Sequence, residues 1–167
     1  LVKASNIVSR RRFLFMLNND TIVKDGSISC LVDFLDSNDR IGAVSPKIMY
    51  AGEHNCIQYA GATELTTITL RNKTIGKDEE DRGQYDTFQK TSFLHGAAML
   101  VRKEVIEKVG LMPEVYFLYY EEIDWSTQIG GSGFELWYNP ECVIYHKESR
   151  SVGEESYTKL FYMTRNR

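Results

Sequence analysis

The sequence lacks the features of membrane-spanning and nucleic-acid-binding proteins. No apolar run approaches the roughly 20 residues that a membrane-spanning helix needs, and no signal-peptide pattern is present. The formal net charge is -3, and basic residues cluster only in the short run Arg10 to Arg12. We therefore expect a soluble domain with no nucleic-acid partner, because such a partner requires an extended basic surface.

Cysteine is also scarce and gives no framework. The three cysteines, Cys30, Cys56 and Cys142, are odd in number, widely separated and without any CxxC spacing. This pattern argues against a disulfide scaffold and against a cysteine-ligated zinc site. The sequence predicts three free thiols in a reducing, cytoplasmic environment.

The chain has enough hydrophobic residues to form a core. Its 167 residues are 43% hydrophobic and 26% charged, which favours one folded domain over residues 1–167. It has no initiator methionine, its first residue stands just before a helical pattern, and Arg167 falls within another. We therefore expect a piece of a longer protein.

Hydrophobic periodicity predicts alternating strands and helices, with a crossover unit of a mainly parallel sheet over residues 13–50. The charged run at 77–83 is expected to be a mobile, solvated loop, and the last helix to pack on the sheet or on a missing segment. Strands are predicted at 13–17, 41–44, 47–50, 57–59, 68–70, 99–101, 134–138 and 143–145, and helices at 2–8, 28–35, 105–109, 121–129 and 157–164.

Two polar features stand at the ends of predicted buried strands. Asn18 to Thr21 follow the run Phe13–Leu17, and His146 follows Val143 to Tyr145. Ligands of open α/β sheets bind at the carboxyl ends of strands, where an aspartate or a neutral histidine can hold a divalent cation. The alternatives are a plain Asn/Asp turn and a structural histidine.

The stretch Tyr116 to Trp125 combines aromatic residues with three carboxylates, Glu121, Glu122 and Asp124. Burial against aromatic surface and like-charged neighbours both raise the proton affinity of a carboxylate. One of the three is therefore a candidate general base. The alternative is that these acids occupy the first turn of a helix because the helix dipole favours negative charge there.

The order of these motifs resembles family-two glycosyltransferases with the GT-A fold, especially rhamnosyltransferase-like bacterial members. The resemblance implies an α/β fold with a mainly parallel sheet flanked by helices, in which the first strand-helix-strand region is missing. It rests on Leu17–Thr21, His95–Arg102 leading through Val109–Leu111 to Tyr116–Trp125, Gly133–Phe134 leading through Pro140 to Tyr145–Lys147, and Tyr162–Arg167.

The resemblance also assigns roles to residues. It implies that Asp20 and His146 bind a divalent metal, Mg²⁺ or Mn²⁺, and that Glu122 is the catalytic base, with Asp124 as the alternative. Asn18 and Glu122 stand where the family has aspartate. The residues that it places at the substrate are Asn18, Gly96, Ala97, Glu121, Trp125 and Gln128.

The implied reaction is inverting transfer from a nucleotide-diphospho-sugar to an acceptor hydroxyl in cell-surface polysaccharide synthesis. The acceptor is expected to be a saccharide or a lipid-linked intermediate, and the site to lie in the cytoplasm, at the inner face of the membrane. Without the first region, weak nucleotide binding and little turnover are expected of the isolated chain. The main alternative is a noncatalytic carbohydrate-binding or scaffold domain. A glycoside hydrolase is disfavoured because the adjacent Glu121 and Glu122 cannot flank a sugar.

Overall fold

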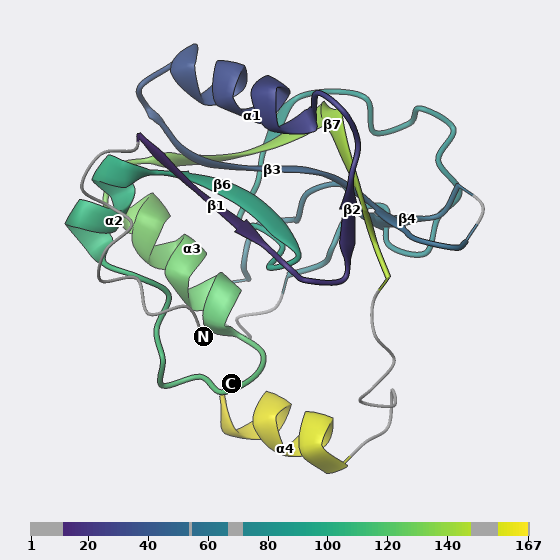
Figure 1. The fold of residues 1–167 in the computed structure, drawn as a ribbon. Coiled ribbons are helices and arrows are strands. Elements are labelled where there is room, and N and C mark those ends of the chain that lie inside the picture. Colours follow the sequence, from purple (N-terminus) through teal and green to yellow (C-terminus); the bar gives the residue numbers. More distant parts are fainter. Residues whose placement is uncertain (1–11, 54, 67–71, 148–156, 167) are drawn as a thin grey trace.

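The computed structural model describes residues 12–53, 55–66, 72–147 and 157–166 (Figure 1). The helix predicted at 2–8 and the strand predicted at 68–70 lie outside these residues. The elements in chain order are β1 (Phe13–Leu17), β2 (Thr21–Val23), α1 (Ser27–Asp36), β3 (Ile41–Tyr50), β4 (Ile57–Tyr59), β5 (Gln89–Lys90), β6 (Ala98–Arg102), α2 (Lys103–Val109), α3 (Glu121–Gly131), β7 (Glu135–His146) and α4 (Tyr157–Arg165).

The strands form one mixed sheet in the order β1-β6-β3-β7-β2, with β4 beside β3 and β5 beside β7. The α/β class with a sheet flanked by helices is confirmed. The sheet is less parallel than we predicted, since β3 and β7 form the one parallel pair among the described strands. Because β1 and β3 are both antiparallel to β6, they run in the same direction, as the predicted crossover through α1 requires.

Helices cover both faces of the sheet, and the alternation of side chains along the strands explains why. Val44 of β3 packs in a cluster with Leu31 and Leu35 of α1, and Ile41 joins the same cluster because the register of β3 shifts between Ile41 and Ala43. Ala43, which points the opposite way, packs in a cluster built around α2 and α3. Figure 1 shows α1 above the sheet and α2 and α3 below it.

The two strands predicted at 134–138 and 143–145 form one long strand, β7. The register of β7 against β3 shifts between Pro46 and Lys47, which pair with Asn139 and Val143. Local contacts support this irregularity, since the side-chain oxygen of Asn139 accepts a hydrogen bond from the backbone N–H of Glu141. The strand then continues to His146, which it delivers to the rim of the sheet.

The charged run at 77–83 is tied to the sheet. The Lys47 side chain is buried, and its ammonium group bonds to Asp81 at 2.8 Å and also to Asp86. The hydroxyl of Tyr50 donates to Asp78 at 2.9 Å. The run is largely exposed, as expected of a solvated loop. Asp78 and Asp81 nevertheless anchor it to the sheet, because a buried lysine needs carboxylate partners.

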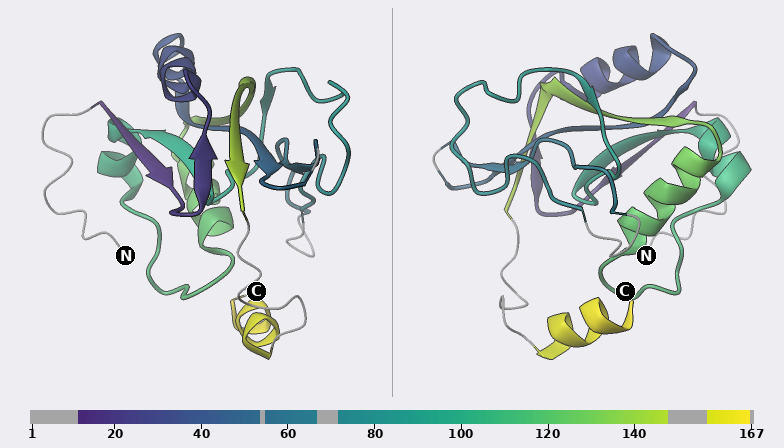
Figure 2. Two further views of the ribbon diagram at one scale, coloured as in Figure 1. Left: turned by 45° about the vertical axis from the view of Figure 1, so that its right-hand side comes forward. Right: turned by 180° about the vertical axis from the view of Figure 1, so that it is seen from behind.

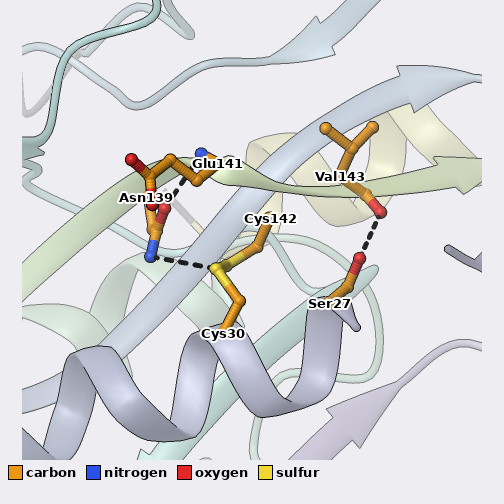
Figure 3. The surroundings of a disulfide bond; sticks show 6 residues. All are labelled: Ser27, Cys30, Asn139, Glu141, Cys142 and Val143. Carbon is orange, nitrogen blue, oxygen red and sulfur yellow. Dashed lines mark hydrogen bonds between the residues drawn. A yellow bond between two sulfur atoms is a disulfide. The ribbon is translucent and has the colours of Figure 1, made fainter. Parts of the chain in front are cut away.

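Cys30 of α1 and Cys142 of β7 form a disulfide (Figure 3). The prediction of a free thiol holds for Cys56 and is wrong for this pair. Sequence spacing could not reveal the bond, because its residues are 112 positions apart and meet only when α1 packs on the sheet. Beside it, the Ser27 hydroxyl donates to the Val143 carbonyl, so the two elements are joined at a second point.

Removing this bond is expected to lower the free energy of unfolding. The double change Cys30→Ser and Cys142→Ser should cost about 2–5 kcal/mol, the usual range for a native disulfide in a small domain. Urea unfolding of the oxidised chain measures the loss, and Cys56→Ser is the control. An unchanged urea midpoint in the double variant would contradict the expectation.

The last helix, α4, lies below the sheet, beside the loop that leads into α3 (Figures 1 and 2). The face expected to pack on the sheet is open to solvent: Tyr157, Leu160 and Phe161 are 93%, 67% and 60% exposed. Of the two partners expected for this face, the sheet is therefore excluded, and packing on a segment outside the present chain stays a prediction. Among the described helices, none is both long and apolar enough to cross a membrane.

Candidate active site

Asp20 and His146 meet at one rim of the sheet. Asp20 lies in the turn between β1 and β2, and β2 pairs with β7 so that Thr21 stands opposite His146. The turn is closed by a hydrogen bond from the Thr21 hydroxyl to the Asn18 carbonyl, at 2.7 Å. As a result, Oδ1 of Asp20 lies 3.1 Å from Nε2 of His146.

The hydrogen-bond partners of His146 determine the orientation and the tautomer of its imidazole ring. Nδ1 lies 2.9 Å from the side-chain oxygen of Gln58, which can only accept, so Nδ1 carries the proton. In the neutral ring, Nε2 then holds a lone pair. The amide nitrogen of Asn18 lies 3.4 Å from this Nε2.

This arrangement fits a cation. Two atoms with lone pairs, Asp20 Oδ1 and His146 Nε2, face each other at 3.1 Å, which is favourable only with a proton or a metal ion between them. The described part of the chain contains no group of three or more His, Cys, Asp or Glu side chains that could hold a metal. A metal held here would complete its coordination with oxygens from outside the protein, such as those of a phosphate.

The turn His95-Gly96-Ala97 lies next to Asn18. The N–H of Ala98 donates to the His95 carbonyl at 3.2 Å, and the N–H of Asn18 donates to the Ala97 carbonyl at 3.0 Å. Burial, helped by the nearby charges of His146 and Lys77, lowers the pKa of His95 to about 4. His95 is therefore neutral, and its Nδ1 accepts the N–H of Ala97 at 3.1 Å.

Glu122 lies against the other side of this turn. Its carboxylate accepts a hydrogen bond from the backbone of Gly96, and its Cδ atom is 3.1 Å from where a Cβ of residue 96 would be. Gly96 is therefore required for close approach. Burial, followed by the charge of Glu121, raises the pKa of Glu122 to about 7, which suits a general base near neutral pH.

The other acids of α3 have different surroundings. Burial raises the pKa of Glu121, whose Oε2 atom is buried and has no hydrogen-bond partner among the described residues. Asp124 accepts hydrogen bonds from the Gln128 amide at 3.2 Å and from Tyr116. Asp124 and Gln128 thus satisfy each other on α3, whereas Glu122 faces the turn at Gly96.

Two residues predicted at the substrate lie in the core. Trp125 of α3 is 1% exposed, packs in the core cluster shared with the sheet and donates its indole N–H to the Gly110 carbonyl at 3.1 Å. Ala97 is equally buried and contributes its backbone to the turn. These positions give Trp125 and Ala97 a packing and backbone role, and neither side chain has surface for a substrate.

The predicted base and the predicted metal ligands therefore belong to one connected group. Contacts run from His146 and Asp20 to Asn18, and from the Asn18–Ala97 hydrogen bond through the turn to Glu122. Sequence reasoning missed Gln58, although a polar residue between Ile57 and Tyr59 in a buried strand is itself a signal of a required hydrogen bond.

The sequence was compared with family models and with curated proteins. No family model matches the chain. Over 165 residues it is 24% identical to an N-acetylglucosaminyl-diphospho-decaprenol L-rhamnosyltransferase of Mycobacterium tuberculosis, in strains CDC 1551/Oshkosh and ATCC 25618/H37Rv. The match covers 89% of this chain and 51% of that protein, so the chain spans about half the length of the curated relatives it matches.

The fold matches a solved glycosyltransferase structure. A crystal structure of GalNAc-T7 with UDP, GalNAc and Mn²⁺ superposes with a TM-score of 0.60 over 81% of this chain and 27% of that chain, at 15% identity. In fold and in sequence, the chain is GT-A-like. The predicted resemblance to GT-A glycosyltransferases is thereby confirmed, and at such low identity the structural match speaks for the fold alone.

The GT-A-like fold explains why the site forms where it does. The end of β1, the end of β7, the turn before β6 and the start of α3 all lie at one rim, so residues distant in sequence become neighbours. The Mn²⁺ in that structure is bound to GalNAc-T7, and the comparison by itself assigns no metal to the present chain.

Proposed function

We propose that the protein transfers a glycosyl group, with inversion, from a nucleotide-diphospho-sugar to an acceptor hydroxyl. The observation that carries the proposal is the position of Glu122: a partly buried carboxylate held by the Gly96 backbone, with its pKa raised to about 7 by burial and the Glu121 charge. A carboxylate in this state accepts a proton readily near neutral pH.

The proposed reaction is a single displacement. Glu122 takes the proton from the acceptor hydroxyl as that oxygen bonds to the anomeric carbon. The bond between that carbon and the diphosphate oxygen breaks, and its electron pair leaves with the nucleoside diphosphate. Because attack and departure occur on opposite sides of the carbon, the anomeric configuration inverts.

We infer that Asp20 and His146 hold a divalent metal, Mg²⁺ or Mn²⁺. Their facing Oδ1 and Nε2 atoms and the hydrogen bond from Nδ1 to Gln58 support this role. A metal bound there supplies positive charge to the diphosphate. Asp20 must stay ionised for this task and Glu122 must exchange a proton, so the two carboxylates need different surroundings, as they have.

Transfer is the test of this proposal. The complete gene product would be incubated with nucleotide-diphospho-sugars, Mn²⁺ and saccharide acceptors, with release of nucleoside diphosphate as the readout and NMR of the product for the anomeric configuration. A product with inverted configuration supports the proposal. Retained configuration contradicts it, and saccharide binding without any transfer would favour the noncatalytic alternative.

The rate of transfer is expected to depend on pH through Glu122. The base acts only when ionised, so kcat/KM should rise about tenfold per pH unit below the pKa of about 7 and level off above it. Replacing Glu121 with Gln removes a charge that raises this pKa, so the midpoint should move to lower pH. A pH profile of both proteins measures this, and a flat wild-type profile between pH 5 and 8 would contradict it.

We further propose a lipid-linked saccharide as the acceptor, at the cytoplasmic face of a membrane and in surface-polysaccharide synthesis. The name of the mycobacterial relative, which includes a diphospho-decaprenol, and the exposed aromatic and aliphatic face of α4 support this. Transfer to a diphospho-prenol-linked saccharide should exceed transfer to the same free saccharide. Equal rates would contradict the lipid-linked acceptor while leaving transfer itself intact.

A further inference from the structure

The loop that leads into α3 has an unusual backbone. Tyr119 and Tyr120 both have positive φ angles, 65° and 75°, and Tyr120 is the N-cap residue of α3. Such angles are strained for large side chains, and two consecutive ones persist only where surrounding contacts enforce them. Glu121 and Glu122 follow immediately, so this turn determines where α3 begins.

Asn166, just beyond α4, supplies such contacts. Its side-chain nitrogen donates to the Leu118 carbonyl at 2.6 Å and to the Tyr119 carbonyl at 3.0 Å. An asparagine amide has two N–H donors, and both are used here on consecutive carbonyls. The Asn166 side chain is thus hydrogen-bonded to the strained turn at Tyr119, where the positive φ angles begin.

Further contacts hold α4 on the same loop. The rings of Tyr162 and Phe117 lie 5.2 Å apart, and the guanidinium group of Arg165 donates to the Val115 carbonyl at 3.4 Å. Figure 1 and both views of Figure 2 show the end of α4 beside this loop. Asn166 is therefore brought to the turn by a docked helix.

The two ends of α3 are secured differently. Trp125 and Ile129 are buried in the core, which fixes the middle and end of the helix. The first turn carries Glu122, and its position follows from the backbone at Tyr119 and Tyr120. A shift there would withdraw the Glu122 carboxylate from the Gly96 backbone that it contacts.

We propose that Asn166 is a positioning residue, which holds the strained turn before α3 in the conformation that sets Glu122 against Gly96. The proposal rests on the proposed role of Glu122 as the base. It gives α4 a task for the site although the helix contributes no side chain to the reacting atoms. Aspartate cannot replace Asn166, because an ionised carboxylate has no N–H to donate and repels the two carbonyls.

The experiment compares Asn166→Asp with Thr164→Val in the complete gene product. Both changes keep the size of the side chain, and the Thr164 hydroxyl donates within α4, to the Leu160 carbonyl at 2.8 Å. Asn166→Asp should speed hydrogen exchange over residues 118–124 and lower kcat by about 10²-fold, the loss typical of a base displaced by about 1 Å. Thr164→Val should change neither.

A glycine at position 119 separates positioning from a general structural role. Glycine adopts a positive φ without strain, so in a Tyr119→Gly background the loss caused by Asn166→Asp should be several-fold smaller. The same loss of kcat in both backgrounds would overturn the proposal. So would either of two results for Asn166→Asp alone: faster exchange with an unchanged kcat, or no change in hydrogen exchange over residues 118–124. Full transfer by Glu122→Gln would refute the proposed base instead, and the exchange data would still report whether Asn166 holds the turn.

Discussion

Replacing Glu122 with Gln is expected to lower kcat for glycosyl transfer by about 10²–10⁴-fold, the contribution typical of a general base. The amide keeps the size of the side chain and still accepts the Gly96 N–H, yet it cannot take the acceptor proton. Donor binding should be unchanged, because the donor diphosphate is assigned to Asp20 and His146. Turnover with the complete gene product and donor titration measure the two quantities.

Neighbouring acids provide matched controls for this change. Asp124→Asn removes the alternative base, whose carboxylate is engaged by Gln128 and Tyr116, and should retain most of the activity. Should Asp124→Asn abolish transfer while Glu122→Gln does not, the base is Asp124. Wild-type rates in both variants would remove the general-base mechanism from this site.

Gly96 should be almost as sensitive as Glu122 itself. A Cβ at this position would meet the Glu122 carboxylate, with Cδ at 3.1 Å and Oε1 closer still. Gly96→Ala should therefore displace the base and reduce kcat by about 10²-fold. Transfer assays measure this, and Gly130→Ala, where a Cβ meets nothing within 4 Å, is the control.

Local signals in the sequence were sufficient to predict many elements. The apolar run Phe13–Leu17 and the i, i+3, i+4 spacing in α1 predicted β1 and α1 close to their observed bounds. The spacing succeeded because Leu31 and Leu35 are buried, whereas β1, predicted as a buried strand, is only partly buried and Leu17 is exposed. Gly110 ended α2 as predicted, and its φ of 83° shows why a glycine stands there.

Long-range pairing was beyond such signals. Nothing in the local pattern shows that β6 lies antiparallel between β1 and β3, so the sheet appeared more parallel than it is. Two further features depend on the same tertiary arrangement: the bond between Cys30 and Cys142, and the burial of Lys47 with its aspartates. Each joins segments that only the complete fold brings together.

The site was predictable to the extent that its residues stand at element ends. Asp20 and His146 were singled out because they follow strands, whereas the residues alone left Glu121, Glu122 and Asp124 open as the base and the family resemblance selected Glu122. Their roles stay predictions, and the structure brings the three residues into one connected group. The resemblance placed Trp125 at the substrate, whereas the structure buries its side chain in the core. The helical spacing to Ile129, which is also buried, was the available clue.

Replacing Asp20 with Asn is expected to abolish most metal binding at the rim. The change keeps the shape of the side chain but removes the negative charge that faces His146 Nε2 at 3.1 Å. The affinity for Mn²⁺ in the presence of a nucleoside diphosphate should fall by more than about 10²-fold, beyond the 10–100-fold loss usual for residues that only orient a ligand. Calorimetric titration of the complete gene product measures this.

Variants of Gln58 are expected to weaken Mn²⁺ binding less than Asp20→Asn does, which gives a comparison of intermediate size. Gln58→Leu removes the acceptor of the Nδ1 proton of His146 and should weaken Mn²⁺ binding by about 10–100-fold, because the ring is then free to turn or to change tautomer. Gln58→Glu keeps an acceptor at this point, so it should bind Mn²⁺ more tightly than Gln58→Leu. Wild-type affinity in both Asp20→Asn and His146→Ala would show that the metal, if one is used, binds elsewhere, since neither lone pair could then be a ligand.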